Sequence, residues 1–195
     1  MSVLVGVVGV QGDVSEHREA FRRAGEALGI DVETVGVRGS GVVPDCDVIG
    51  VPGGESTTIS RLLRTEGIDE EVRQHVENGG GTLATCAGLI VLGNTDDDRV
   101  ESLGVIDADV ERNAFGGQRE SFEADIDLNG LDKPFHAVFI RAPVVSDVGD
   151  DTDVLAELRG DTVAVKQGNV VGTAFHPELT DDHRIHELVL RGYDD

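Results

Sequence analysis

Short apolar runs alternate with helix-like segments through the first half of the chain, and this alternation restricts the folds open to it. Residues 3–10 form a nearly continuous apolar run, as expected for a strand buried on both faces of a sheet. From Val14 to Leu28 apolar side chains then recur every three or four residues, which predicts a helix. Asp13 followed by Glu16 resembles a capping box at its start.

The same alternation continues to about residue 93. Further strands are predicted at 31–37, 47–51 and 82–86, and helices at 57–66, at 69–78 and from Ala87 onward. Strands separated by helices favour an α/β fold with a mainly parallel sheet and helices on both of its faces.

Beyond about residue 104 the pattern changes to consecutive strands separated by Gly, Asn and Asp turns. Strand-like runs are found at 105–113, 121–128, 136–143, 162–167 and 170–175, and a clear helical pattern returns only at 180–192. Consecutive strands predict an antiparallel or mixed extension of the sheet. Because no repeat, low-complexity tract or linker interrupts the chain, we expect one domain over residues 1–195.

The charge of the chain excludes several kinds of partner. It carries 38 acidic and 16 basic side chains, a formal net charge of −22. Such a surface repels nucleic acid and anionic lipid, so neither nucleic acid nor a membrane is expected as a partner. The acidic residues are spread along the chain, which suggests a folded protein adapted to high salt, where counterions screen their repulsion.

The location is expected to be cytoplasmic. No apolar run approaches the ~20 residues that span a bilayer, and the first residues resemble a strand more than a signal peptide. The two cysteines, Cys46 and Cys86, make no disulfide framework, which fits a reducing compartment. Cys46 lies between two aspartates and lacks a nearby base, so we expect it to be inert.

Cys86 lies among small residues where a predicted strand turns into a helix. A buried structural role is the commoner explanation for a cysteine taken alone. A sharp strand-to-helix turn, however, would hold a nucleophile on an exposed elbow, and the helix N-terminus would favour the thiolate. The backbone N–H of Ala87 would then face an oxyanion formed by attack of Cys86.

Two further segments would meet Cys86 at the carboxyl ends of the strands. Gly54, in the turn after the strand at 47–51, would supply a second oxyanion donor, although an ordinary βα turn explains this segment equally well. His176 and Glu178 close the last strand. Residues two apart in extended chain point the same way, so they can form a hydrogen-bonded pair that serves Cys86 as a base.

The pattern as a whole resembles the class I, triad-type glutamine amidotransferases, and within them the glutaminase subunit of pyridoxal 5′-phosphate synthase. The resemblance runs from residue 3 to about residue 190, and RNAFG, SFE and HPELT together are specific to that family. It is carried by Val10-Gln11-Gly12, PGGESTT (52–58), TCAGLI (85–90), RNAFG (112–116), Gln118, SFEAD (121–125), FIRAP (139–143) and FHPELTDDHR (175–184).

The resemblance implies a flavodoxin-like α/β fold and hydrolysis of L-glutamine to glutamate and ammonia through a glutamyl thioester on Cys86. His176 would act as base and then acid, supported by Glu178, and the ammonia would pass to a separate synthase subunit. Neither a cofactor nor a metal is expected. Glutamine binding is implied for Gly54, Glu55, Ser56, Arg112, Ile140 and Arg141, and a part in the oxyanion hole for Gly54, Ala87 and Gln11.

Two positions depart from the family pattern. Ala84 stands where the elbow usually has glycine, and its methyl group could crowd the turn. Gly117 stands where a basic residue is common. Among the remaining histidines, His183 and His186 are expected on a solvated helix face and not in a metal cluster, and His17 is expected to pack or to form a hydrogen bond.

Two rival functions stay open. One is a cysteine hydrolase or glutaminase of a related class that serves another acceptor. The other is a binding or regulatory subunit that has lost turnover, although the presence of Cys86, His176 and Glu178 together argues against it.

Overall fold

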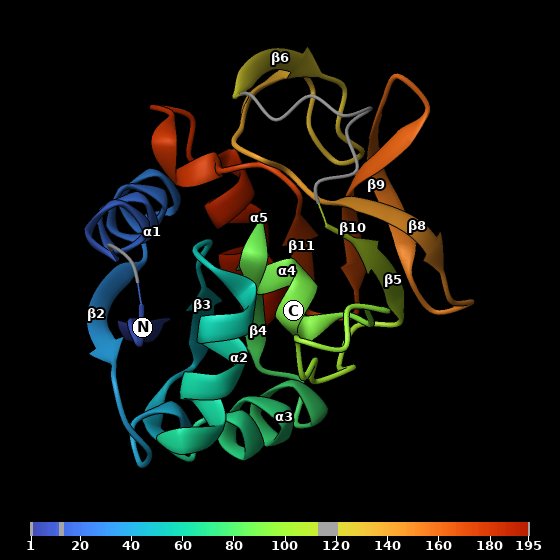
Figure 1. Cartoon of the computed structure of the whole chain (residues 1–195). Helices are drawn as coiled ribbons and strands as arrows, with labels where there is room; N and C mark the ends of the chain where they lie inside the picture. The colour runs from blue at the N-terminus through green and yellow to red at the C-terminus, as the bar shows by residue number, and fades with distance from the viewer. Residues whose placement is uncertain (1, 12–13, 113–120, 195) are drawn as a thin grey trace.

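The computed structural model describes residues 2–11, 14–112 and 121–194. Its main sheet begins with a parallel half in the order β2-β1-β3-β4-β11 (Figure 1). These strands are β1 (Ser2–Val8), β2 (Asp31–Val37), β3 (Val48–Val51), β4 (Gly81–Thr85) and β11 (Val170–Thr173). The strands predicted in the first half are therefore confirmed, and β2 has the predicted bounds.

An antiparallel half continues the sheet from β11, as the consecutive strands predicted. It contains β10 (Asp161–Gln167), β8 (Val144–Val148) and β5 (Ala108–Glu111), and β9 (Asp153–Leu158) pairs with β10. The sequence did not predict β8 and β9. Both strands carry acidic residues, which hide the alternation expected of a half-buried strand.

Two of the predicted strands lie outside this sheet. β6 (Phe122–Ile126) and β7 (Phe135–Phe139) form an antiparallel hairpin of their own, so the expectation that they extend the main sheet was wrong. The hairpin uses its apolar face to cover the sheet: the rings of Phe135 and Phe139 lie 5.6 and 5.5 Å from the ring of Phe175. Burial of this aromatic cluster positions the hairpin.

Helices cover both faces of the parallel half, as predicted. α1 (Ser15–Leu28) and α5 (Arg184–Asp194) pack into one hydrophobic cluster, and α2 (Ser56–Thr65), α3 (Asp69–Glu77) and α4 (Ala87–Leu92) into the other. Alternate residues of β1 supply the two clusters, because successive side chains of a strand point to opposite faces. Short 3₁₀ turns, η1 (Val43–Asp45) and η2 (Pro177–Leu179), complete the elements.

The start of α1 differs from the predicted capping box. Val14 is the N-cap residue, without a side-chain hydrogen bond, and Asp13 lies outside the described residues. The helix ends as its sequence suggests, at Gly29 in the left-handed conformation with φ +71°. Within the described ranges, no helix combines the length and apolarity needed to cross a bilayer.

Candidate active site

The turn from β4 into α4 holds Cys86 in a conformation that L-residues rarely adopt, with φ 50° and ψ −108°. Such a sharp strand-to-helix turn raises the side chain of the middle residue above the sheet edge. The Cys86 N–H donates a hydrogen bond of 2.8 Å to the carbonyl oxygen of Thr173, at the end of β11. The elbow is therefore tied to the strand that leads to His176.

Two glycines allow the backbone to approach closely around this elbow. A Cβ on Gly88 would overlap the carbonyl oxygen of Val51, so only glycine fits the start of α4 against β3. A Cβ on Gly53 would lie 2.6 Å from Cε1 of His176 and 3.4 Å from Cβ of Cys86. Cys86 and His176, ninety positions apart in sequence, thus both lie against Gly53.

Ala84, by contrast, belongs to the strand and not to the turn. It is fully buried in the middle of β4, where it pairs with Val51 of β3 and Gly172 of β11. The strained residue of the elbow is Cys86 itself, so the added methyl group lies in the core and away from the bend. The other departure, Gly117, and the motif residues 113–118 with it lie outside the described residues.

His176 and Glu178 form the expected pair, with 2.7 Å between His176 Nδ1 and Glu178 Oε1. They do so in a different backbone conformation from the extended chain that the sequence suggested. His176 is the N-cap residue of η2, and Pro177 and Glu178 form the turn itself. Proline suits the first position of a helical turn, because its φ is already fixed near the helical value.

The charges of this pair favour an imidazolium. Burial alone lowers the pKa of His176, but its interactions with the Cys86 sulfur and the Glu178 carboxylate raise it to about 10. Burial likewise raises the pKa of Glu178, and the charges and hydrogen bonds of His17 and His176 outweigh it and hold that pKa well below its usual range. A charged imidazole between sulfur and carboxylate is the arrangement that a cysteine nucleophile requires.

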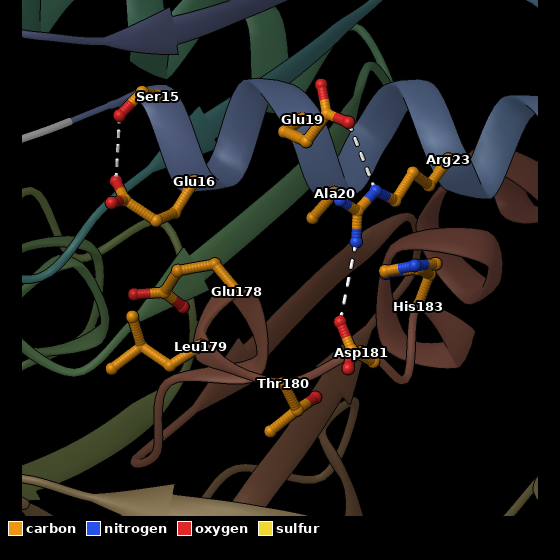
Figure 2. Close-up of a pocket in the computed structure, with 10 residues that line it drawn as sticks. All are labelled: Ser15, Glu16, Glu19, Ala20, Arg23, Glu178, Leu179, Thr180, Asp181 and His183. Atoms are coloured by element: carbon orange, nitrogen blue, oxygen red, sulfur yellow. Dashed lines mark hydrogen bonds and ion pairs between the residues drawn. The ribbon is translucent and has the colours of Figure 1, made fainter.

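Glu178 also faces the underside of α1. Figure 2 shows α1 running above the segment from Glu178 to His183, with Arg23 bridging Glu19 and Asp181. These residues line a separate cavity of about 450 Å³, on the other side of Glu178 from the elbow.

The elbow opens into a cavity of about 650 Å³ that gathers all six residues expected to bind glutamine. The turns after β3 and β4, the RNAFG motif and the FIRAP motif all contribute to its wall. The lining residues are Gly54, Glu55, Ser56, Cys86, Ala87, Ile90, Arg112, Ser121, Ile140, Arg141 and His176. Ile90 and Ser121 were not predicted, because neither residue type signals a binding site by itself.

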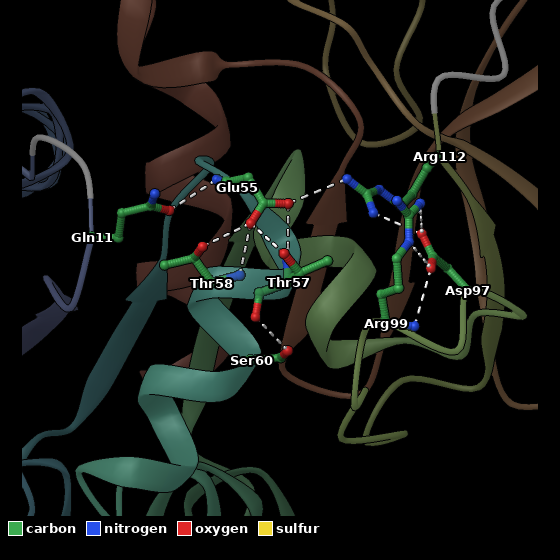
Figure 3. Close-up of polar contacts among 8 residues, drawn as sticks. All are labelled: Gln11, Glu55, Thr57, Thr58, Ser60, Asp97, Arg99 and Arg112. Carbon is green, nitrogen blue, oxygen red and sulfur yellow. Dashed lines mark hydrogen bonds and ion pairs between the residues drawn. The ribbon is translucent and has the colours of Figure 1, made fainter.

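Glu55 and Arg112 are linked to each other across the cavity (Figure 3). Glu55 is the N-cap residue of α2 and accepts hydrogen bonds from the backbone N–H groups of Thr57 and Thr58, at 3.3 and 2.8 Å. Hydrogen bonds from the Thr57 and Thr58 side chains and N–H groups lower the pKa of Glu55 to about 2. Its carboxylate also lies 3.3 Å from Arg112 Nη2.

Asp97 is a second acidic partner of Arg112 that the sequence did not reveal. Its Oδ2 lies 2.6 Å from Arg112 Nη1, and Arg99 contacts the same carboxylate (Figure 3). The hydrogen bonds from Arg99 and Arg112 hold the pKa of Asp97 well below its usual range. Arg112 is therefore held from two sides beside the cavity.

Three more predicted residues show specific geometry. Gly54 has φ +149°, and its backbone lies against Gln11, whose Oε1 accepts a 2.9 Å hydrogen bond from the N–H of Glu55. The carbonyl oxygen of Ile140 lies 3.8 Å from the Cys86 sulfur. Arg141 has φ +47°, an uncommon conformation for a non-glycine residue that is often found at functional sites.

The remaining histidines differ in part from expectation. His186 is fully buried, so its predicted place on a solvated helix face was wrong; α5 turns it toward Phe21 of α1, with ring centroids 4.8 Å apart. His17 is 1% exposed and reaches Glu178 and Thr85, as the expected packing or hydrogen bond allowed. Among residues 2–11, 14–112 and 121–194, no group of three or more potential ligands is arranged to hold a metal ion.

The pKa of the Cys46 thiol is raised, as expected from its two aspartate neighbours, and burial is the larger cause. Burial raises the pKa of its thiol to about 11, and the charges of Asp45 and Asp47 add to this effect. The prediction considered only the two aspartates.

A mixed sheet flanked by helices, with a cysteine elbow at the end of its parallel half facing a buried His–Glu pair, defines the class of glutamine amidotransferase-like proteins. A solved structure described as a glutamine amidotransferase has the same fold, with a TM-score of 0.85 at 45% identity over 98% of this chain and 99% of the other. The model of the SNO glutamine amidotransferase family matches residues 7–194, and the chain belongs to this family.

Curated relatives are similar over nearly their whole length. The chain is 61% identical to the pyridoxal 5′-phosphate synthase subunit PdxT of Halorubrum lacusprofundi, over 95% of this chain and 94% of the relative. It is 62% identical to the protein of the same name from Haloquadratum walsbyi, over 96% and 92%. A glutamine amidotransferase structure from Thermotoga maritima, 12% identical over 99% of both chains with a TM-score of 0.67, shares the fold.

Proposed function

We propose that this chain is the glutaminase subunit of a pyridoxal 5′-phosphate synthase, and that Cys86, His176 and Glu178 carry out its reaction. The family and the relatives named above support the glutaminase and its pathway. The observation that carries the residue assignment is the elbow at Cys86, which faces both the His176–Glu178 pair and a cavity lined by the glutamine-binding motifs.

In the proposed reaction the Cys86 thiolate attacks the side-chain amide carbon of L-glutamine. The carbon–nitrogen bond breaks, and His176 gives its proton to the departing nitrogen. Ammonia departs, and a glutamyl thioester remains on Cys86. His176, now neutral, takes a proton from water, whose oxygen attacks the thioester and releases glutamate. Glu178 stabilises the imidazolium that exists before the first step and after the second.

The N–H groups of Ala87 and Gly54 are proposed to stabilise the oxyanion of each tetrahedral intermediate. Both residues line the cavity, Ala87 is the first residue of α4, and the φ of Gly54 sets its peptide in a conformation that suits glycine. For Gln11, the proposed contribution comes from its peptide, and the next residue, Gly12, lies outside the described residues. Loss of one such donor typically costs about 3 kcal/mol of transition-state stabilisation.

Arginine is suited to the α-carboxylate of the substrate, because its planar guanidinium binds a carboxylate with two parallel hydrogen bonds. We therefore propose Arg112 and Arg141 as the cationic residues of the glutamine site, with Glu55, Ser56 and Ile140 around the rest of the substrate. Ser56 supports this proposal: it is 2% exposed, and its hydroxyl oxygen is buried without a hydrogen-bond partner among the described residues.

The ammonia is proposed to pass to a separate synthase subunit in the cytoplasm. The free thiols Cys46 and Cys86 are compatible with that compartment. Stimulation by the pyridoxal 5′-phosphate synthase subunit would separate this assignment from a glutaminase that serves another acceptor.

The test is glutamate release from L-glutamine, measured with and without that synthase subunit. Wild type is expected to be active in the complex and Cys86→Ala inactive. Cys46→Ala should stay close to wild type, since Cys46 packs beside Gly6 of β1 and does not line the cavity. Activity that survives Cys86→Ala would overturn the mechanism. A wild-type complex without glutaminase activity would favour the regulatory subunit instead.

A further inference from the structure

Each oxygen of the Glu178 carboxylate lies close to a histidine nitrogen, and only one of these two contacts is explained by the triad. Oε1 accepts from His176, whereas Oε2 lies 3.3 Å from Nε2 of His17, near the start of α1. The side chains of His17 and Glu178 are 1% and 8% exposed, so water does not compete for this contact. In such surroundings the orientation of a carboxylate depends on the few groups that touch it.

The same ring contacts the strand that carries the nucleophile. His17 Nε2 lies 3.2 Å from Oγ1 of Thr85, the last residue of β4 and the neighbour of Cys86. Thr85 is fully buried. One imidazole from α1 thus touches both the acid of the triad and the residue before the sulfur.

A second buried histidine determines which nitrogen of His17 carries the proton. Nε2 of His186 lies 3.5 Å from Nδ1 of His17, and burial holds the pKa of His186 well below its usual range, so this ring is neutral. Nδ1 of His186 is buried without a hydrogen-bond partner among the described residues, where a bare acceptor costs less than an unpaired N–H. The proton of His186 then lies on Nε2 and points to His17. The proton of His17 lies on its own Nε2, which is 3.2 Å from Thr85 Oγ1 and 3.3 Å from Glu178 Oε2.

We propose that His17 is a positioning residue for glutamine hydrolysis, one that holds the second oxygen of Glu178 and thereby aims the first at His176. The proposal rests on the proposed function, because it needs Glu178 to act through His176 on Cys86. His186 supports it by fixing the tautomer of His17. His186 then donates to His17, the protonated Nε2 of His17 faces the second oxygen of Glu178, and His176 donates to the first oxygen from the other side.

Among the groups around Glu178, His17 is the second histidine in direct contact with the carboxylate. Those that face it from its own segment and from the packed helices are His176, His17 of α1 and His186 of α5, and the rim of the cavity in Figure 2 adds Glu16, Glu19, Arg23, Asp181 and His183. The contacts with His17 and His176 are what lower the pKa of Glu178 against the effect of burial. Removal of His17 therefore raises the pKa of Glu178.

The test compares His17→Leu with His17→Gln. Glutamine keeps an N–H near the place of Nε2, whereas leucine keeps only bulk. The readout is the rate at which iodoacetamide alkylates Cys86 as a function of pH, because the imidazolium of His176 sustains the thiolate. Cys46 is expected to react little with iodoacetamide below about pH 9, since burial raises the pKa of its thiol to about 11. Alkylation of Cys86→Ala measures this background reaction.

His17→Leu is expected to move the acid limb of alkylation to higher pH by about one unit, the worth of one hydrogen bond to a charged group. It should also lower kcat, measured in the complex with the synthase, about tenfold, with KM for glutamine nearly unchanged. His17→Gln is expected to recover at least half of both changes. Leu190→Ala, which opens a cavity in the same core cluster, should lower the melting temperature and leave the acid limb in place.

Equal behaviour of His17→Leu and His17→Gln, or an acid limb that stays at the wild-type pH in both, would overturn the proposal and leave the triad intact. An alkylation limb that Leu190→Ala moves as much as His17→Leu does would also overturn it, because the effect would then come from packing. Glutaminase activity in Cys86→Ala would instead overturn the proposed function. The two failures are therefore distinguishable.

Discussion

At the scale of single residues, the site depends on one side chain whose charge is set by two others. His176 lies between the Cys86 sulfur and the Glu178 carboxylate, and their interactions raise its pKa to about 10 in spite of burial. Because the pKa of His176 is raised to about 10, its imidazolium is present below about pH 10 and is lost above it. The proposed acid for the leaving nitrogen is thus available through the physiological range.

Glu178→Gln is expected to lower the pKa of His176, because the amide keeps the size of the side chain and removes its charge. The alkaline limb of the kcat/KM profile for glutamine should therefore move to lower pH, and kcat should fall by roughly 10²-fold or more. Glu187→Gln, in the i,i+4 ion pair with Arg191 on α5, is the matched control and should leave the profile unchanged. An alkaline limb that Glu178→Gln leaves in place would contradict the role of the carboxylate.

The residues that the sequence could and could not identify differ in the kind of signal they carry. Cys86, Gly54 and His176 stand at the ends of buried strands, in short motifs with a local mechanism, and these patterns can be read from one sequence. His17, His186 and Asp97 have no such pattern. Their roles arise because α1, α5 and the loop after α4 pack against the site, and only the packing shows what each side chain touches.

At the scale of elements, the first turn of α2 contributes both to the stability of the helix and to the proposed glutamine site. Its N-cap residue, Glu55, satisfies the backbone N–H groups of Thr57 and Thr58 with the same carboxylate that contacts Arg112. The carboxylate of Glu55 must therefore cap the helix and keep its contact with Arg112 at the same time. Substitutions that shorten or remove the carboxylate separate these two roles.

Glu55→Asp is expected to keep the cap, since aspartate is a preferred N-cap residue, and to lose reach toward Arg112. Its melting temperature should stay near that of wild type while KM for glutamine rises. Glu55→Ala should raise KM as well and should also lose the cap, worth about 0.5–2 kcal/mol, or a few degrees of melting temperature in a chain of this size. Thermal unfolding and steady-state kinetics of both variants test this, and equal melting temperatures would contradict it.

The elements also show where sequence patterns stop being informative. Buried parallel strands such as β3 are recognisable because they are apolar and flanked by turns, whereas β8 and β9 mix acidic residues into short runs. The β6–β7 hairpin has ordinary strand patterns. The choice between joining the main sheet and folding over it depends on where Phe135 and Phe139 find aromatic partners, which is a tertiary property.

At the scale of the whole molecule, acidic side chains dominate the surface. Many of the few basic residues are arginines in surface ion pairs, among them Arg23, Arg64, Arg99 and Arg191. Exposed pairs of this kind contribute little individually, so the net charge of −22 leaves a large self-repulsion in the folded state. Curated relatives come from halophilic archaea, where this repulsion is screened.

The melting temperature is expected to rise with potassium chloride, because between about 0.1 and 1 M salt the Debye length falls from about 10 Å to about 3 Å. Sucrose at matched osmolality is the control: it acts through exclusion from the surface and does not screen charge. Thermal unfolding followed by circular dichroism gives both curves. A melting temperature that does not change with the concentration of potassium chloride would contradict adaptation to high salt.

The position of β4 between β3 and β11 has a consequence for protein synthesis. All of the sequence up to β4 can emerge from the ribosome and fold against β3, but the other edge of β4 has no neighbour until Val170–Thr173 arrives. Cys86 is then exposed beside an open strand, with no histidine to activate it. Under the proposed mechanism the unfinished chain cannot release ammonia, because β11 both closes this edge of β4 and leads to His176.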